Sequence, residues 1–289
     1  MFLAMRINLH CHSNYSDGRN PPSALIDILA QERPDIISLT DHDSISGIAE
    51  AKARCKQRGI TLLPGIEFSV SLAETSLSFA TKYTAFHLLA YGFDVEMMKE
   101  KIKVHHAKMK SGVAALIREL KVMNYDISKE DLPDNDFWTS YNVAQVLVAK
   151  KYASNIWFAF DNIIRKAKNR RIFFCSPKEI IDIVHECHGL AFLAHPFDII
   201  EDDMKIAITR RDSDELFSYL LNLGIDGIEG YYQPYSQDVQ DYLIAKAKKH
   251  NLLLSYGTDY HGGRPYKEAT YIEVPELPCW LADFVSSRK

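Results

Sequence analysis

The chain has 289 residues, of which 47% are hydrophobic and 25% are charged, and its formal net charge is −4. This composition supplies one large core, or a core plus a small inserted unit, and argues against a protein that coats nucleic acid through general positive charge. We expect no membrane span, because no apolar stretch is long enough, and no signal peptide at the weakly charged start. Five scattered cysteines without a CxxC pair predict reduced thiols and a cytoplasmic protein.

The first part of the chain alternates short apolar runs with amphipathic stretches, which is typical of βα units. Two helices are expected, one after the Pro21-Pro22-Ser23 start and one that ends at Gly59, a natural C-cap residue. These helices are predicted at about 21–32 and 44–58, and the strands at 6–10, 35–39, 60–63, 67–70 and 84–91.

The alternation stops after residue 94 and returns near residue 177. Residues 95–123 read as one long helical stretch, and 125–174 contain helical pieces without a convincing strand. Beyond them the pattern predicts helices at 177–188, 215–223 and 237–250, alternating with strands at 190–194, 225–229 and 252–256. We therefore expect an α/β barrel formed by residues 1–98 and 175–289, interrupted by a small helical subdomain at 99–174.

Side chains that bind metals follow the predicted strands. His10 and His12 flank Cys11, so an extended backbone points both imidazoles to one face. The carboxyl ends of parallel strands converge on one mouth of a barrel, where active sites form. Imidazole and carboxylate donors suit zinc, manganese or iron. The predicted metal ligands are His10, His12, Asp17, His42, Glu67, His87, His195, Asp259 and His261.

Each short motif has an ordinary structural explanation when taken alone. The segment Thr40-Asp41-His42-Asp43 can start a helix, and Asp41 or Asp43 can equally orient a ligand or cap that helix. Pro64-Gly65 can simply be a turn, and Ala194-His195-Pro196 can simply end a strand. The occurrence of all these motifs in one chain favours a metal site, because chance alone would not place a metal-binding residue type after each predicted strand.

Taken in order, these segments resemble the motifs of the PHP (polymerase and histidinol phosphatase) superfamily. The segments are HCHSNYSDG, SLTDHDS, LLPGIEFS, FHLLAYG, FLAHPF and SYGTDYHGG. Within the superfamily the chain resembles the stand-alone phosphoesterases that include 3′,5′-nucleoside bisphosphate phosphatases and a 5′-to-3′ exoribonuclease. The resemblance implies a distorted (β/α)7 TIM-like barrel, up to three bound divalent metal ions (Mn, Zn or Fe), and catalysis involving Asp17, His42, His195 and Asp259.

The resemblance also implies how the ligands divide among three ions. His10, His12, Glu67 and Asp259 would hold the first, and Asp17, His42 and His261 the second. Glu67 would reach a third ion, completed by His87 and His195. Such a centre suits hydrolysis of a phosphate ester, because bound cations lower the pKa of water and offset charge on the leaving oxygen.

The insert departs from the pattern of the bisphosphate phosphatases, which place an Arg and a His near this point to grip a second phosphate. Here Tyr141 and Asn142 stand in their place, and both can donate hydrogen bonds without carrying charge. Arg19 and Arg264 follow metal-site motifs and are further candidate phosphate contacts. A basic run in the insert favours a solvated helix face over a phosphate contact; it consists of Arg165, Lys166, Lys168, Arg170 and Arg171. A set of aromatic residues favours a small hydrophobic core of the insert over stacking on a base; it consists of Phe137, Trp138, Tyr141, Trp157 and Phe158.

The sequence thus predicts a metal-dependent phosphoesterase for a small phosphorylated substrate, a nucleotide or the end of a short oligonucleotide, and leaves phosphatase and exonuclease activity both open. Two alternatives remain at this stage. One is a metal-dependent amidohydrolase, although such barrels usually use a bridging carboxylated Lys or Glu with different strand motifs. The other is a metal-binding sensor or interaction module without turnover. The oligomeric state is not predicted.

Overall fold

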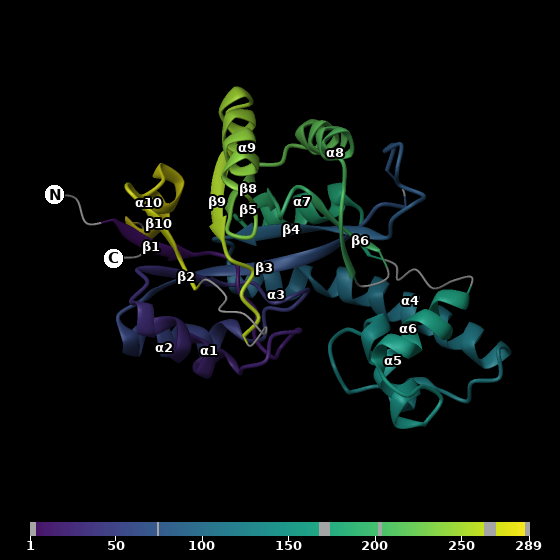
Figure 1. The fold of residues 1–289 in the computed structure, drawn as a ribbon. Helices are drawn as coiled ribbons and strands as arrows, with labels where there is room; N and C mark the ends of the chain where they lie inside the picture. Colours follow the sequence, from purple (N-terminus) through teal and green to yellow (C-terminus); the bar gives the residue numbers. More distant parts are fainter. Residues whose placement is uncertain (1–3, 74, 168–173, 202–203, 263–269, 287–289) are drawn as a thin grey trace.

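Seven short strands of the computed structural model curve into a nearly closed barrel, and the structure describes residues 4–73, 75–167, 174–201, 204–262 and 270–286 (Figure 1). The barrel order is β1 (Met5–Asn8), β2 (Ile36–Leu39), β3 (Thr61–Ser71), β4 (Ala85–Tyr91), β5 (Leu190–Leu193), β8 (Gly227–Tyr232) and β9 (Leu253–Gly257). β9 returns to β1, where the Leu9 backbone N–H donates to the Tyr256 carbonyl at 2.8 Å. The predicted α/β barrel is confirmed.

One strand distorts the barrel. β4 runs antiparallel to both β3 and β5, whereas the β1–β2, β2–β3, β5–β8 and β8–β9 pairs are parallel. Two parallel neighbours need a long crossover between them, but an antiparallel pair does not. The described residues that join β3 to β4, 72–73 and 75–84, therefore contain no helix. The predicted strands 60–63 and 67–70 are one continuous strand, β3, rather than two.

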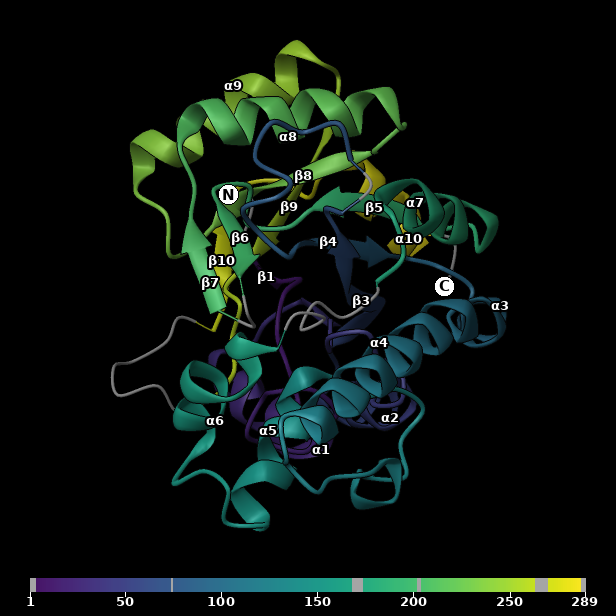
Figure 2. The same cartoon turned by 90° about the vertical axis from the view of Figure 1, so that its right-hand side faces the viewer.

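Amphipathic helices cover the outside of the barrel, and apolar side chains such as Leu25, Ile180 and Leu216 are buried beneath them (Figure 2). Gly59 ends one of these helices with a φ of 70°, as its C-cap role requires. The covering helices are α1 (Pro22–Leu29), α2 (Ile48–Arg58), α7 (Pro177–Glu186), α8 (Arg210–Asn222) and α9 (Gln237–Lys249), and η1 (Ala30–Glu32) extends the first by a short 3-10 turn.

Four short elements were not predicted. β6 (Asp198–Glu201) and β7 (Met204–Ala207) form an antiparallel hairpin beside β4. β10 (Ile272–Val274) pairs antiparallel with β1, and α10 (Cys279–Ser286) follows it. The strands have only three or four residues each, which is too short for a reliable periodic pattern.

The chain between β4 and α7 is mainly helical where the structure describes it, and residues 109–167 form a unit that projects from the barrel, at the lower right of Figure 1. A separate cluster of buried side chains, from Met109 to Ala167, forms its core. This cluster supports the predicted insert, whose boundaries after residues 98 and 174 stay a prediction. The elements here are α3 (Val95–Lys101), α4 (Lys103–Val122), η2 (Lys129–Asp131), α5 (Ser140–Ala149), α6 (Ile156–Asn162) and η3 (Ile164–Lys166).

The helix α4 belongs to both parts of the molecule. Its first turns carry His105 and His106, which are buried against the barrel, and its later turns carry Leu116 and Leu120 into the core of the insert. Within the described ranges, neither α4 nor any other helix combines the length and apolar character needed to cross a membrane.

Candidate metal centre

The structure brings all nine predicted metal ligands together at one mouth of the barrel. Three overlapping groups have donor atoms within 4.8 Å of one another: His10, His12, Glu67 and Asp259; His12, Asp17, His42 and His261; and His42, Glu67 and His87. His195 joins the third group, because its Nε2 lies 3.3 Å from His87 Nδ1. The residues come from segments as distant in sequence as Asp17 and His261, whose side chains meet at 3.1 Å.

The carboxylate of Glu67 connects two of these groups. Its Oε2 lies 3.0 Å from His10 Nε2 and 3.2 Å from His12 Nε2. Its Oε1 faces the other way, 2.8 Å from His87 Nδ1 and 2.9 Å from His195 Nε2. A buried carboxylate with one oxygen toward each group has the arrangement of a ligand that bridges two cations.

The expectation that every ligand lies at or beyond a strand end is wrong for two residues. Glu67 lies in the middle of β3, since that strand extends past the mouth to pair with β4. His87 lies near the beginning of β4 and reaches the same mouth because β4 runs in the opposite direction. His10 and His12 follow β1 as expected, and Cys11 between them pairs with Tyr260.

The carboxylates favour positive charge at some imidazoles of the site, whereas burial lowers the pKa of His42 to about 4 and that of His195 to about 3. Burial alone would lower the pKa of His12, but the close carboxylates of Asp259 and Glu67, each 3.2 Å from its Nε2, and the charge of Asp17 raise it to about 9. Burial would raise the pKa of Glu67, but His10, His42 and other imidazoles hold it well below its ordinary value. The carboxylates therefore form a field that attracts protons or metal ions.

Several imidazole nitrogens in the site are buried without a partner. Among the described residues, both ring nitrogens of His12, Nδ1 of His42 and Nδ1 of His195 lack a hydrogen bond. A buried polar atom without a partner is costly, so its presence calls for an ion or a bound molecule. The residues present therefore fit a set of divalent cations, with Asp17, Glu67 and Asp259 as the anionic donors.

An outer carboxylate, Glu229 on β8, holds two of the ligands in place. Its Oε1 accepts a hydrogen bond from His10 Nδ1 at 2.8 Å, and its Oε2 accepts one from the His195 backbone N–H at 2.8 Å. The proton on Nδ1 leaves Nε2 of His10 free for a cation. A Cβ at position 257 would lie 2.1 Å from Glu229 Oε1, so Gly257 is what allows this approach.

A second outer network holds Asp259. Its Oδ2 accepts a hydrogen bond from Tyr232 Oη at 2.9 Å and pairs with the ammonium of Lys205 on β7, while Oδ1 lies 3.2 Å from His12 Nε2. Sequence reasoning missed both partners. Strands β6 and β7 have only four residues each, which is too short for a periodic pattern, and nothing in the sequence points Lys205 toward Asp259.

Asp41 and Asp43 brace the ligand loops and do not cap a helix. Helix α2 begins at Ile48, after Gly47, so the predicted start at residue 44 is wrong. Asp41 accepts hydrogen bonds from the Ser13 backbone and hydroxyl at 2.6 and 2.7 Å, which ties down the loop that carries Asp17.

Asp43, next to His42, is held from the insert side. His105 Nε2 on α4 donates to Asp43 Oδ1 at 2.8 Å, and Ser69 donates to Asp43 through its backbone and its hydroxyl. Burial would raise the pKa of Asp43, but His105 lowers it below the ordinary value. Sequence reasoning assigned no role to His105.

Three residues of the site adopt a left-handed backbone without being glycine. The φ angles are 52° at Asp43, 25° at His195 and 54° at Asp259. Such a conformation costs about 1–3 kcal/mol per residue and persists only where surrounding contacts enforce it. The strain indicates that the surrounding contacts hold these three side chains in fixed positions at the expense of a relaxed backbone.

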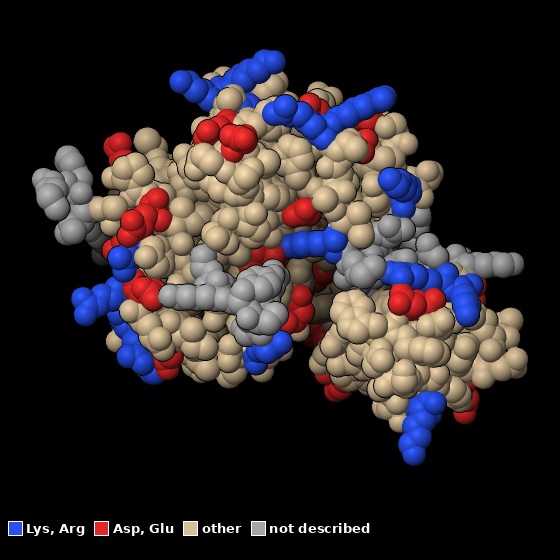
Figure 3. Space-filling view, in the orientation of Figure 1, with Lys and Arg blue, Asp and Glu red and all other residues tan. Residues whose placement is uncertain are grey.

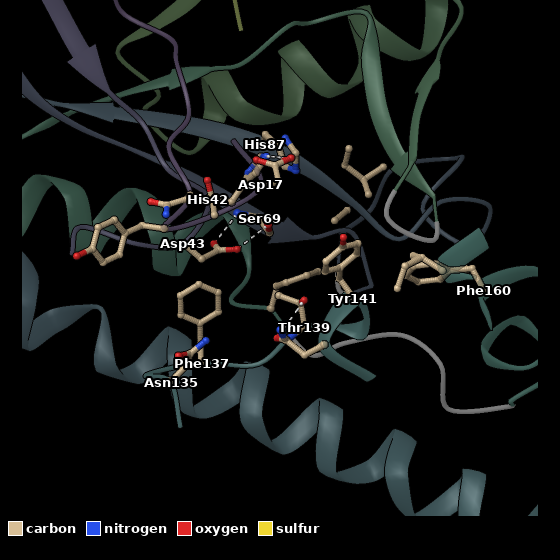
Figure 4. Close-up of a pocket in the computed structure, with 18 of the residues that line it drawn as sticks. Asp17, His42, Asp43, Ser69, His87, Asn135, Phe137, Thr139, Tyr141 and Phe160 are labelled. Carbon is tan, nitrogen blue, oxygen red and sulfur yellow. Dashed lines mark hydrogen bonds and ion pairs between the residues drawn. The ribbon is translucent and has the colours of Figure 1, made fainter. Parts of the chain in front are cut away.

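A cavity of about 510 Å³ opens beside the ligands and runs to the insert (Figure 4). Asp17, His42 and His87 lie at the end formed by the barrel, and Tyr141 and Phe160 lie at the end formed by the insert. In the space-filling view the barrel and the insert lobe are separated by a hollow with acidic side chains on its border (Figure 3).

Only some of the residues predicted to contact the substrate line the cavity. Tyr141 and Asn142 both line the cavity, but Asn142 Oδ1 already accepts a hydrogen bond from the Thr139 backbone at 2.9 Å and so caps α5. Arg19 is exposed and is not among the described residues that line the cavity. Outside the described residues lie Arg264 and, in the basic run, Lys168, Arg170 and Arg171.

The prediction that the aromatic residues build the core of the insert is half wrong. Phe137 and Trp138 pack against that core. Tyr141, Trp157 and Phe158 are exposed instead, at 48%, 64% and 43%. In α6 the buried residues are Ala159 and Phe160, whereas Trp157 and Phe158, two residues earlier, lie at exposed positions.

A distorted barrel with clustered imidazoles and carboxylates at its mouth defines a metal-dependent hydrolase. The chain belongs to the PHP domain family, which it matches over residues 8–153. A 5′-3′ exoribonuclease of Haemophilus influenzae is 26% identical over 267 residues, covering 90% of this chain and 91% of the relative. A 3′,5′-nucleoside bisphosphate phosphatase of Chromobacterium violaceum is 26% identical over 286 residues, covering 95% of each chain. The predicted superfamily and subgroup are confirmed.

The fold is also that of a solved structure described as a metal-dependent phosphoesterase, from Bifidobacterium adolescentis. The two structures superpose with a TM-score of 0.70 at 21% sequence identity, over 99% of this chain and 96% of the other. At this identity the likeness shows the fold alone.

Proposed function

We propose that the chain is a metal-dependent phosphoesterase that hydrolyses a phosphate ester of a small nucleotide, such as a nucleoside bisphosphate, or of an oligonucleotide end. The observation that carries the proposal is the convergence of the nine predicted ligands at one mouth of the barrel, where the two oxygens of Glu67 face different groups. The family and the activities for which both relatives are named support it.

The proposal includes up to three divalent cations, manganese, zinc or iron. His10, His12 and Asp259 would hold one with Glu67 Oε2, and His87 and His195 would hold another with Glu67 Oε1. The more open group at Asp17, His42 and His261 would hold the third. When bound, such cations lower the pKa of water and offset the negative charge of a phosphoryl group.

The protein's own contribution is to fix the donors before substrate binds. Glu229 keeps the proton of His10 on Nδ1, and Tyr232 with Lys205 turns Asp259 Oδ1 toward the imidazoles. The catalytic roles proposed for Asp17, His42, His195 and Asp259 are those of ligands that orient the reacting groups. We also propose that the protein works in the cytoplasm, which its buried free thiols Cys11, Cys55, Cys175 and Cys187 support.

The proposal is tested by removing and restoring metal. The purified protein is stripped with a chelator, reloaded separately with Mn²⁺, Zn²⁺ and Fe²⁺, and assayed on an aryl phosphate, nucleotides, 5′-phosphorylated oligonucleotides and amides. We expect release of phosphate, or of mononucleotides from the oligonucleotides, only after reloading, with up to three metal ions per chain by elemental analysis. Amide cleavage without phosphate release would instead establish an amidohydrolase, and full metal occupancy without any turnover would establish a sensor.

A further inference from the structure

The insert side of the cavity carries exposed aromatic side chains. Among the described residues, the exposed large aromatic side chains are Tyr15, Tyr141, Trp157 and Phe158. All of them except Phe158 line this one cavity. Large apolar rings that gather at a concave site, rather than scattering over the surface, mark a surface that binds a ligand.

The charge of the residues that line the cavity does not complement a second phosphate group of the substrate. The described lining residues include the carboxylates Asp17 and Asp43 and no Lys or Arg. Phosphate recognition in proteins usually relies on Arg, Lys or a cluster of backbone amides. Away from the metal ligands, the described wall offers aromatic faces and neutral polar groups such as Asn135 and Thr139. These groups complement an uncharged planar group.

The position of the aromatic rings fits one molecule that reaches both ends of the cavity. Figure 4 shows Tyr141 across the hollow from Asp17, His42 and His87. The volume of about 510 Å³ is within the range of about 300–1,000 Å³ typical of small-ligand sites. A substrate whose phosphate lies at the metal centre would therefore extend its remaining part toward the insert.

We infer that Trp157 and Tyr141 form a stacking subsite for a nucleobase. The inference rests on the proposed function and deepens it, because it makes the base, and not a second phosphate, the feature that the insert recognises. The substrate class is then a nucleotide or a single-stranded oligonucleotide end with any base, since every base offers a π face to an aromatic ring. The 64% exposure of Trp157 leaves its ring available for this contact.

The experiment compares Trp157→Ala and Tyr141→Ala with a matched control, Phe158→Ala, which removes a neighbouring exposed ring that does not line the cavity. Dissociation constants are measured by calorimetry, with Mn²⁺ present, for adenosine 5′-phosphorothioate and for ribose 5-phosphate, which lacks a base. Removal of either lining ring should weaken nucleotide binding about tenfold relative to ribose 5-phosphate. The Phe158 variant should match the wild type for both ligands.

A fourth variant separates stacking from a merely structural role. Trp157→Phe keeps an aromatic face, so it should retain most of the nucleotide affinity while losing the quenching of tryptophan fluorescence that the base causes in the wild type. Circular dichroism checks that each variant is folded, and the Tyr141 variant carries the test if the Trp157 variants are not.

The inference is overturned if both alanine variants keep the wild-type ratio of nucleotide to ribose 5-phosphate affinity, or if both ligands weaken equally. Either result leaves the proposed function standing when the wild type hydrolyses phosphate esters. Failure of the proposed function has a different signature, which is that the metal-loaded wild type releases neither phosphate nor mononucleotides from any ester.

Discussion

The two walls of the cavity are built in opposite ways. The barrel wall, which includes His42 and His87, is backed by the buried residues His10, Glu67 and Asp259, and outer residues such as Glu229 hold these in place. On the insert wall, Tyr141 and Trp157 are half or more exposed. The comparison indicates that the reaction depends on a rigid network of buried polar groups, whereas recognition uses a surface that can change without disturbing that network.

The largest expected effect comes from removing two ligands of the barrel wall together. In the variant His10→Ala/His12→Ala, metal-supported hydrolysis of an aryl phosphate should fall to the level of the chelator-treated protein, because the first group of donors loses both imidazoles. Phosphate release and the metal content per chain are measured in parallel.

The matched control for this variant is His188→Asn. His188 is an exposed histidine at the surface with a φ of 60°, a conformation that asparagine tolerates. Its activity and metal content should equal those of the wild type. Undiminished turnover in the double variant would show that the barrel wall is not the reacting wall.

A smaller effect is expected when an outer residue of the barrel wall is changed. Glu229→Gln keeps the size of the side chain but removes the charge that fixes the proton on His10 Nδ1. Metal affinity should fall about 10- to 100-fold, as is usual for partners of metal-bound histidines. The measurement is a competition titration with a fluorescent chelator.

The control for Glu229→Gln is Glu273→Gln, which alters an exposed carboxylate that pairs with Arg6 on the outer edge of the barrel. Metal affinity should not change in this control. Equal metal affinity of the wild type and the Glu229 variant would mean that the ligands hold their positions without outer partners. It would contradict the claim that the reaction depends on a rigid network behind the barrel wall.

The smallest effect on the reaction is expected from removing the hydrogen bond between His105 on α4 and Asp43, which joins the helix that enters the insert to the barrel. His105→Ala leaves the Asp43 carboxylate without its buried imidazole partner, so the free energy of unfolding should fall by about 1–3 kcal/mol. His105→Gln, which retains a donor, should recover part of the loss. Urea denaturation measures both variants, and identical midpoints for the wild type and His105→Ala would rule out this brace.

Much of the barrel and of the ligand set could be predicted from sequence, because both depend on local patterns. Alternating apolar runs place the strands, and donor residues such as His10 and Asp259 stand within short motifs. Glu67 and His87 were predicted as ligands although the assumed reason, a position beyond a strand end, was wrong.

The parts that were missed depend on contacts between distant segments. Glu229 meets His10 across 219 residues, and Lys205 meets Asp259 across 54. Neither pair leaves a local signature, and the hairpin that carries Lys205 is too short to have a clear period. The exposure of Trp157 depends on which face α6 turns to the core of the insert, which a seven-residue helix does not specify by pattern alone.

The continuity of α4 limits how this protein can be engineered. Because one helix supplies both His105 at the barrel and Leu116 inside the insert, the insert is not a detachable cassette. A chimera that grafts a relative's recognition unit after residue 98 would delete the imidazole that holds Asp43 beside His42. Grafts that begin beyond His106 would preserve that contact, and we expect only these to exchange specificity while keeping the hydrolytic centre intact.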